Sequence, residues 1–225
     1  MYTFTLPSGL EAELREMTGA EESLLTNRRL MKDGEAVNQV LRNCLARLGD
    51  KTEVAAKDVL DLLSGDRLFL LVKLRQISFG DEVDLTLTCP AKDCGETTDV
   101  HIALDDLDVT SYGTEREFIF ELPRTKKPVI FTLLDGHMEK RLAVLKAPDL
   151  HSAMLMRVKE IDGKAPNKNS LAELPAFDLN ALRAEMQRVD GGIDTTIHAV
   201  CSSCGARIVT RLEAEPPFLF PNVRL

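Results

Sequence analysis

Two pairs of cysteines limit what this chain can fold into more than any other feature of its sequence. Cys89 and Cys94 lie in "TCPAKDCGE", and Cys201 and Cys204 lie in "CSSCG", so a C-x4-C pair and a C-x2-C pair are separated by a long insertion. Paired cysteines indicate a tetrahedral metal site, and four thiolates leave no open position for water or substrate. The pattern predicts one structural Zn²⁺ per chain, bound by all four sulfurs.

The same cysteines permit other chemistry. Cys201 and Cys204 alone match a redox C-x-x-C motif, although such a motif starts a helix, whereas "CSSCGARIVTRLEA" continues as an alternating strand. Bound iron, or reduced thiols without any metal, would also fit the spacing. Cys44, in "VLRNCLARL", lies on an apolar helix face and is expected in the core. The start "MYTFTLPSGL" lacks the features of a signal peptide, so we expect an intracellular start, which favours metal binding over disulfides.

An internal repeat accounts for the long insertion between the two cysteine pairs. "YTFTLP" resembles "FIFELP", and "ISFGDEVDLTLTC" aligns without a gap with "VDGGIDTTIHAVC". The two matches have similar spacing, because 85 residues separate Phe4 from Cys89 and 81 separate Phe120 from Cys201. A chance combination of two generic hairpins and two generic zinc knuckles is the alternative, since short apolar patterns recur freely.

The repeat predicts an α+β fold of two pseudo-repeated halves, residues 1–112 and 113–225. Each half is expected to contain a β-hairpin, several helices and a zinc-knuckle hairpin, and the halves meet at a shared zinc-ribbon-like site. The metal would then close a loop of more than 100 residues, which limits the conformations of the unfolded chain and so stabilises the fold.

Helices are predicted between these landmarks. In "GEAVNQVLRNCLARLGD" apolar residues recur with helical spacing, with Asp33 as a plausible cap and Gly49 as a plausible end. "AAKDVLDLL" follows, and then "SGDRLFLLVKLRQISFG", which Asp66 could cap. In the second half, "APDLHSAMLMRVKEIDG" and "FDLNALRAEMQRVDGG" take the same places, with Asp149 and Asp178 as candidate caps and a polar loop between them.

Composition and charge disfavour two classes of function. No apolar run approaches the roughly 20 residues that span a bilayer, so no membrane partner is expected. The net charge of −8, the absence of tryptophan and the presence of only two tyrosines argue against a nucleic-acid binder. Residues 1–112 hold 12 basic and 21 acidic side chains, whereas residues 113–225 hold 16 and 15. An acidic half would dock on basic protein surfaces, although acidic solvated helix faces explain the same numbers.

No catalytic constellation is recognisable in the sequence. Glycine-rich phosphate loops, G-x-S-x-G and H-E-x-x-H are absent, and the four histidines are scattered. His198 lies three residues before Cys201, but a surface position is favoured because four thiolates complete the metal shell. Asp66, Arg67 and Arg75 could form an ion-pair network or, alternatively, a phosphate site. We therefore expect a protein that is not an enzyme and has no small-molecule substrate.

Several strings together resemble a known family. "LPSGLEAELREMTGAEESLL", "LLSGDRLFLLVKLRQISFG", "CPAKDC" and "CSSC" are similar to the zinc-containing, T4-type baseplate proteins of contractile-tailed bacteriophages, often labelled baseplate hub assembly proteins. The resemblance implies that Cys89, Cys94, Cys201 and Cys204 are zinc ligands. It also implies partners among other tail proteins, and a location in the virion baseplate or, during assembly, in the host cytoplasm.

Three hypotheses for function follow from these observations. The first is a structural or assembly protein of the phage tail baseplate, either built into the particle or acting as a transient chaperone. The second is a zinc-ribbon module that binds nucleic acid, for which only Lys92, Arg207 and Arg211 lie near the knuckles. The third is a thiol oxidoreductase that uses Cys201 and Cys204, which predicts a depressed thiol pKa.

Overall fold

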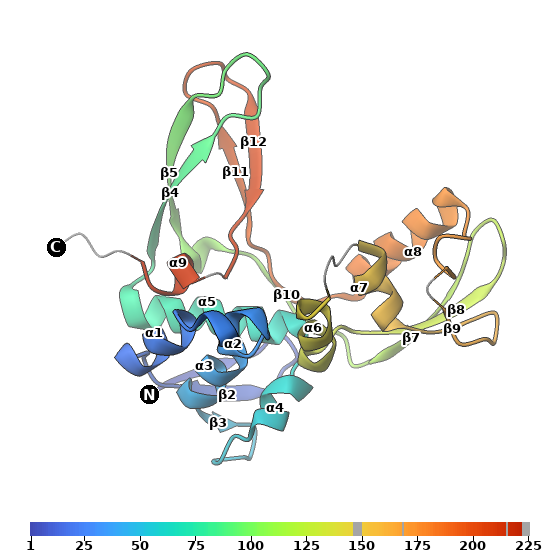
Figure 1. Cartoon of the computed structure of the whole chain (residues 1–225), viewed down its shortest axis with the longest axis horizontal. Helices are drawn as coiled ribbons and strands as arrows, with labels where there is room; N and C mark the ends of the chain where they lie inside the picture. The colour runs from blue at the N-terminus through green and yellow to red at the C-terminus, as the bar shows by residue number, and fades with distance from the viewer. Residues whose placement is uncertain (146–149, 168, 215, 222–225) are drawn as a thin grey trace.

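The chain folds into a helical body, a smaller lobe and an arm of two β-hairpins that projects from the body (Figure 1). The structure is a computed structural model that describes residues 1–145, 150–167, 169–214 and 216–221. Helices and small antiparallel sheets occur together, so the α+β class predicted from the sequence is confirmed. Within these ranges no helix combines the length and the apolar character that crossing a membrane requires.

The body contains an antiparallel sheet with the strand order β1-β2-β3 and a set of helices that cover it. The strands are β1 (Tyr2–Thr5), β2 (Glu11–Leu14) and β3 (Leu45–Leu48). The helices are α1 (Gly19–Leu25), α2 (Arg28–Lys32), α3 (Ala36–Cys44), α4 (Ala56–Asp61) and α5 (Ser64–Phe79). Thr18 and Glu21 form a capping box that fixes the start of α1, as the polar string "TGAEE" favours.

The lobe has a second three-stranded antiparallel sheet, in the order β7-β8-β9. Its strands are β7 (Glu117–Glu121), β8 (Pro128–Thr132) and β9 (Val158–Ile161). Its helices are α6 (Gly136–Ala143), α7 (Leu150–Arg157) and α8 (Ala176–Val189). The Asp135 side chain accepts the Met138 amide and so caps α6.

The two three-stranded sheets share details beyond their strand order. The register of β2 against β3 shifts between Glu13 and Leu14, and that of β8 against β9 shifts between Ile130 and Phe131. In each sheet the third strand follows a helix directly, after Cys44 in the body and after Arg157 in the lobe. Each third strand then turns back through a single bridge: Leu48–Lys51 in the body and Ile161–Lys164 in the lobe.

The arm is made of two β-hairpins that come from distant parts of the chain and lie side by side (Figure 1). One hairpin pairs β4 (Glu82–Thr88) with β5 (Thr97–Ala103), and the other pairs β11 (Thr196–Val200) with β12 (Arg207–Arg211). At the base of the arm the short strands β6 (Val109–Thr110) and β10 (Gly192–Ile193) pair with each other. A 3-10 turn, Leu104–Asp106, follows β5.

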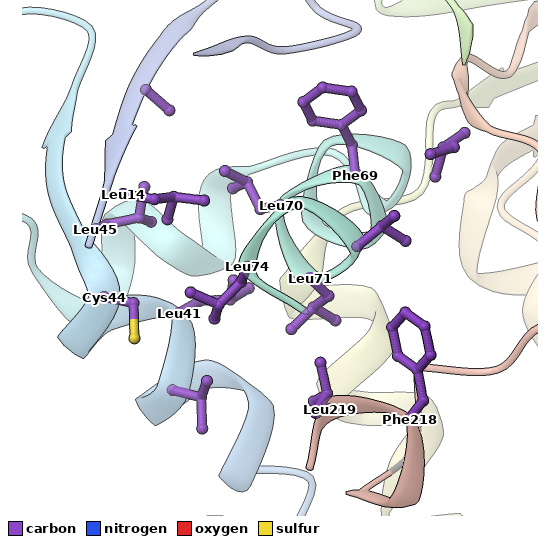
Figure 2. Packing of buried hydrophobic residues seen from close by; sticks show 14 of the residues in the cluster. Leu14, Leu41, Cys44, Leu45, Phe69, Leu70, Leu71, Leu74, Phe218 and Leu219 are labelled. Carbon is purple, nitrogen blue, oxygen red and sulfur yellow. The ribbon is translucent and has the colours of Figure 1, made fainter. Parts of the chain in front are cut away.

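Helix α5 runs through the centre of the body core. Its side chains Leu70 and Leu74 are on the side of α5 that faces the sheet and helix α3, as Figure 2 shows, and both are fully buried. On its other side α5 contacts the short C-terminal helix α9 (Pro216–Leu219), whose Phe218 and Leu219 are also buried. The body core thus includes residues from the C-terminal end of the chain, together with Ile193, Ile197 and Leu212.

The lobe has its own hydrophobic core between its sheet and its helices. The buried members of that core are Leu122, Val129, Phe131, Met154, Val158, Leu171, Leu182 and Met186. Phe118 stacks on Phe131, with ring centroids 5.3 Å apart, and so links the outer strand to the middle strand.

Two predicted helices are shorter than expected. The helix expected up to Gly49 ends at Cys44, and Leu45–Leu48 form β3 instead, because these residues complete the sheet edge beside β2. In the same way α7 ends at Arg157, and "VKEI" forms β9. In both places sheet pairing outweighs a helical apolar pattern.

The predicted caps Asp33, Asp66 and Asp178 are wrong. Asp33 is the C-terminal cap of α2, and Glu35 occupies the N-cap of α3. Asp66 and Asp178 lie inside the first turns of α5 and α8, whose N-caps are Leu63 and Pro175. Their carboxylates accept amides from the turns between the first two strands of each sheet, as described below. The predicted cap Asp149 falls outside the described residues.

Candidate metal centre

The four predicted ligands lie at the outer end of the arm, where each hairpin turns. Cys89 directly follows β4, and its amide donates to the Glu96 carbonyl at 2.8 Å, which closes the first turn. Cys201 directly follows β11, and its amide donates to the Ala206 carbonyl at 2.8 Å, which closes the second. Because both hairpins present their turns at the same end, the sulfurs from the two distant segments meet there.

All four sulfur atoms lie within 4.8 Å of one another. Sγ of Cys89 is 3.6 Å from Sγ of Cys204, and Sγ of Cys94 is 3.8 Å from Sγ of Cys201. A disulfide requires about 2.05 Å, and all of these cysteines are free. Four sulfurs on a tetrahedral Zn²⁺ at about 2.3 Å are about 3.8 Å from each other. These two separations match a tetrahedral zinc shell, and the whole cluster is compact enough to hold one metal ion.

The backbone around the cluster favours thiolate at one sulfur. The amides of Cys204 and Ser203 donate to the Cys201 sulfur and lower the pKa of that thiol to about 6. The Ala91 amide pulls the pKa of Cys89 in the same direction, but burial and the neighbouring sulfurs outweigh it and raise that pKa to about 12. Four thiolates this close repel one another, so all four ionise only around a cation.

Glycines allow both turns to close. Gly95 and Gly205 have φ angles of +64° and +74°, which lie in the left-handed region that other residues rarely adopt. An added Cβ would meet nothing within 4 Å at either position, so the requirement for glycine comes from the backbone conformation rather than from space. The amides that face the Cys201 sulfur come from Ser203 and Cys204.

Burial divides the cluster into an inner and an outer pair. Cys89 and Cys201 are 4% and 2% exposed and pack against Ile208, whereas Cys204 is exposed. An additional contact joins the two turns, because the Ser202 amide donates to the Thr98 hydroxyl at 3.2 Å. His198 is exposed on β11 and is not a member of the cluster, as the sequence predicted.

Cys44 and the charged residues near the start of α5 lie away from this site. Cys44 is fully buried in the body core, and burial raises the pKa of its thiol to about 12. Arg67 donates to Glu139 at 2.7 Å, to the Asn38 side chain and to the Val59 carbonyl. Arg75 instead donates to the carbonyls of Gly80 and Glu82. The predicted network within α5 is therefore wrong, and the donors of Arg67 are already used by protein acceptors.

Sequence reasoning missed two ion pairs, one between the body and the lobe and one within the lobe. Arg67 of α5 reaches Glu139 of α6, and Arg157 of α7 forms two hydrogen bonds with Asp190, at 2.9 and 2.7 Å. These pairs border a cavity of about 430 Å³ that is also lined by Tyr112 at the base of the arm. The sequence carried no signal for these pairs, because their partners are far apart along the chain.

Comparison with known protein families gives a match over most of the chain. The profile of a family described as "T4 bacteriophage base plate protein" matches residues 1–215. No curated protein and no solved structure matches significantly. Because the matching region covers almost the whole chain, including all four clustered cysteines, this protein belongs to the T4 bacteriophage base plate protein family.

Proposed function

We propose that this chain is a non-enzymatic structural or assembly component of a contractile phage tail baseplate, stabilised by one structural Zn²⁺. Family membership supports a structural role in the phage tail and a place in the virion. The observation that carries the metal assignment is the convergence of four free cysteine sulfurs within 4.8 Å at the end of the arm. A role in the host cytoplasm during assembly, as a transient chaperone, is a second form of the same proposal.

Zinc is the metal that the donor set fits best. The observed sulfur separations of 3.6 and 3.8 Å suit the tetrahedral shell of Zn²⁺. A four-thiolate shell has no open position, so the ion would shape the protein rather than activate water or a substrate. Iron also accepts four thiolates, and metal analysis of the purified protein distinguishes the two.

An internal duplication accounts for the way in which the site is assembled. The body sheet and the lobe sheet share strand order, bulge position and a closing bridge, and each is followed by a helix and one hairpin of the arm. These likenesses support two related halves, 1–112 and 113–225, each supplying one zinc-ribbon-like knuckle. The C-terminal residues Phe218 and Leu219 then pack across the boundary onto the body core.

The metal would clamp the two halves at the outer end of the arm, away from the contacts between the body and the lobe. The body and the lobe meet through α6, whose Gly136 amide donates to the Leu62 carbonyl at 3.1 Å, and through the pair Arg67–Glu139. The arm adds a second attachment, because one hairpin comes from each half. Two separate attachments would hold the halves as one rigid unit, as an assembly component needs.

Other tail proteins are the proposed partners. Co-expression with candidate baseplate proteins of the same phage should give a complex that co-purifies through a tag on this chain. A chain that stays alone with every candidate would contradict the proposed role. Mass spectrometry of purified mature particles then separates the two forms of the proposal: a particle component is present in them, and a transient chaperone is missing.

Nucleic-acid binding by a zinc-ribbon module is the second candidate function. Arg207 lies exposed on β12 beside the turn that carries Cys201 and Cys204, which is the observation that favours it, and Arg211 is exposed at the other end of the same strand. Backbone binding to DNA or RNA weakens steeply as salt rises. A binding titration at several salt concentrations, with an Arg207→Glu/Arg211→Glu variant as the control, tests this candidate directly.

A further inference from the structure

The two outer faces of the arm differ in chemistry. Side chains alternate between the faces of each hairpin, and the inward ones, such as Val83, Ile197 and Ile208, pack between the two hairpins. The outward ones are exposed, on opposite sides of the arm. Each hairpin therefore shows one free face, and the residues on these faces have no role in the metal site.

The outer face of the β11–β12 hairpin is apolar and basic. Val200 and Val209 are 62% and 61% exposed there, and the pairing of Val209 with His198 places the two valines on diagonal positions. Arg207 and Arg211 flank them on the same face of β12. We call the outward residues Thr196, His198, Val200, Arg207, Val209 and Arg211 the basic face.

The outer face of the β4–β5 hairpin is acidic and rich in threonine. Asp84 pairs with His101 across the strands at 2.5 Å, and Asp99 accepts a hydrogen bond from Thr86 at 2.7 Å. Glu82 continues the row toward the base of the arm. We call the outward residues Glu82, Asp84, Thr86, Thr88, Thr97, Asp99 and His101 the acidic face.

Side chains on the two faces lie at corresponding levels along the arm. Strands β4 and β11 both run toward the sulfur cluster, so residues equally far before Cys89 and Cys201 lie at the same level. By this measure Arg211, which pairs with Thr196, is level with Asp84. Val209, which pairs with His198, is likewise level with Asp99, which pairs with Thr86. Inverting one arm about the middle pair keeps Val209 opposite Asp99 and places Arg207, which pairs with Val200, opposite Asp84, so the levels fit either direction of the neighbouring arm.

We propose that copies of this chain associate through their arms, with the basic face of one arm against the acidic face of the next. Such a contact joins two different surfaces, so each copy keeps one face free for a further neighbour. Repetition of the contact gives a closed ring if its rotation closes and a helical filament otherwise. This inference goes beyond the proposed baseplate role and does not require it.

The contact is expected to be weak for an isolated pair. Each face is a two-stranded ribbon of five to seven residues per strand. Its area is well below the roughly 800 Å² per partner of a standard stable interface. Charge complementarity would mainly set the orientation of the neighbours and the rate of encounter, and the exposed valines would supply the apolar contact.

Sedimentation equilibrium of the full, zinc-loaded chain, extended to high protein concentration, tests this inference. The wild-type chain should show reversible association beyond a dimer that weakens as salt rises. Val209→Asp places a carboxylate opposite Asp99 of the neighbour and should raise the apparent dissociation constant roughly tenfold or more. Adding Asp99→Lys to the same chain should restore association, because opposite charges then face each other.

Control variants distinguish loss of the contact between copies from loss of the folded structure. Val209→Thr keeps the β-branched shape and should leave association near the wild-type level, and zinc content and melting temperature should stay unchanged in all variants. A chain that remains monomeric at the highest concentration, or a dimer that never grows, overturns the proposal. The proposal is also overturned if Val209→Asp leaves association unchanged, or if the double variant Val209→Asp/Asp99→Lys fails to restore association. Salt-sensitive DNA binding that depends on the basic face, without self-association, would also overturn it.

Discussion

The three-stranded sheets of the body and the lobe share their strand order and bulge position, but they differ in the charged contacts around them. The difference shows which contacts are common to both sheets. In both, an aspartate in the first turn of a helix accepts the amide of a turn that follows the first strand. Asp66 accepts from Ser8 at 2.9 Å, and Asp178 accepts from Arg124 at 2.7 Å. Burial raises the pKa of Asp66, whereas two amides and the Thr125 hydroxyl outweigh burial at Asp178 and lower its pKa.

The residues directly before the third strand of each sheet differ even more in charge. Cys44 ends α3 as an uncharged core residue with no exposed surface. Arg157, at the same place before β9, is buried as well, but it donates to the Thr132 carbonyl and to Asp190. At the junction between the helix and the third strand, the body thus has apolar packing and the lobe has an ion pair. The two sheets share their backbone pairing, whereas the side chains at this junction differ.

Loss of the metal should cause the largest loss of stability, because the ion is the proposed link between the two arm hairpins. Metal analysis should find about one zinc per chain. Cys201→Ser should abolish zinc binding and lower stability by about 4–5 kcal/mol, if the ion acts like a disulfide that closes a loop of roughly 100 residues. Thermal unfolding and limited proteolysis near residues 110–116 measure the effect.

Cys44→Ala is the matched control for that experiment. It removes a thiol that lies in the body core, so zinc content should not change, although a small cavity will lower the melting temperature slightly. If Cys201→Ser makes only the last hairpin susceptible to protease while the linker stays resistant, the proposed clamp between the halves is wrong.

The second largest effect should come from the lobe's buried ion pair. Arg157→Met leaves Asp190 without its partner and should cost about 2 kcal/mol at neutral pH, less than for a fully buried pair because the Asp190 side chain is 36% exposed. Burial already raises the pKa of Asp190, and loss of the arginine raises it further. The stability deficit should therefore shrink as the pH falls and this carboxyl is protonated, as urea unfolding at several pH values would show.

Adding Asp190→Asn to Arg157→Met should recover much of the lost stability, since no unpaired charge then remains. A double variant that is no more stable than the single one would mean that Arg157 acts mainly through its other contacts. These are the hydrogen bond to the Thr132 carbonyl and packing on Phe131, whose ring centroid lies 5.8 Å from the guanidinium.

A smaller change in stability should distinguish Asp66 from Asp178, the two aspartates that accept turn amides. Asp178→Asn should lower the melting temperature by several degrees, because the amide group that replaces one carboxylate oxygen cannot accept from Thr125. Asp66→Asn should change stability by less than about 0.5 kcal/mol, since one amide oxygen still accepts from Ser8 and burial no longer penalises a charge.

The pH dependence of these two variants has opposite signs. A lowered pKa at Asp178 contributes stability above the ordinary value of 3.8 that is lost as the pH falls through the lower folded value. The deficit of Asp178→Asn should therefore shrink in acid. At Asp66 the raised pKa makes the charged form unfavourable, so the wild type should gain relative to Asp66→Asn as the pH falls. Equal responses in the two variants would contradict this difference.

The sequence predicted the convergence of the cysteines and most of the elements, and it failed where tertiary pairing decides local structure. The apolar pattern through Leu45 and Leu48 fits a helix equally well, and only the neighbouring strand makes it β3. The carboxylates at Asp66 and Asp178 look like caps, but the turns they bind lie more than 50 residues away. Periodicity and capping rules describe residues that are close along the chain. They therefore cannot predict a neighbouring strand or a turn that is distant in sequence.

A local effect at the end of the arm tests whether the two metal turns are equivalent despite their different lengths. Gly95→Ala and Gly205→Ala should each cost about 1 kcal/mol, because both glycines have positive φ and an alanine there is strained although the space is open. Gly113→Ala is the matched control, with open space and no positive φ, and should be neutral. Thermal unfolding and chelator competition for the metal measure all three variants. If Gly95→Ala proves harmless while Gly205→Ala is costly, the longer first turn relaxes around the added methyl group, and only the shorter knuckle depends on its glycine.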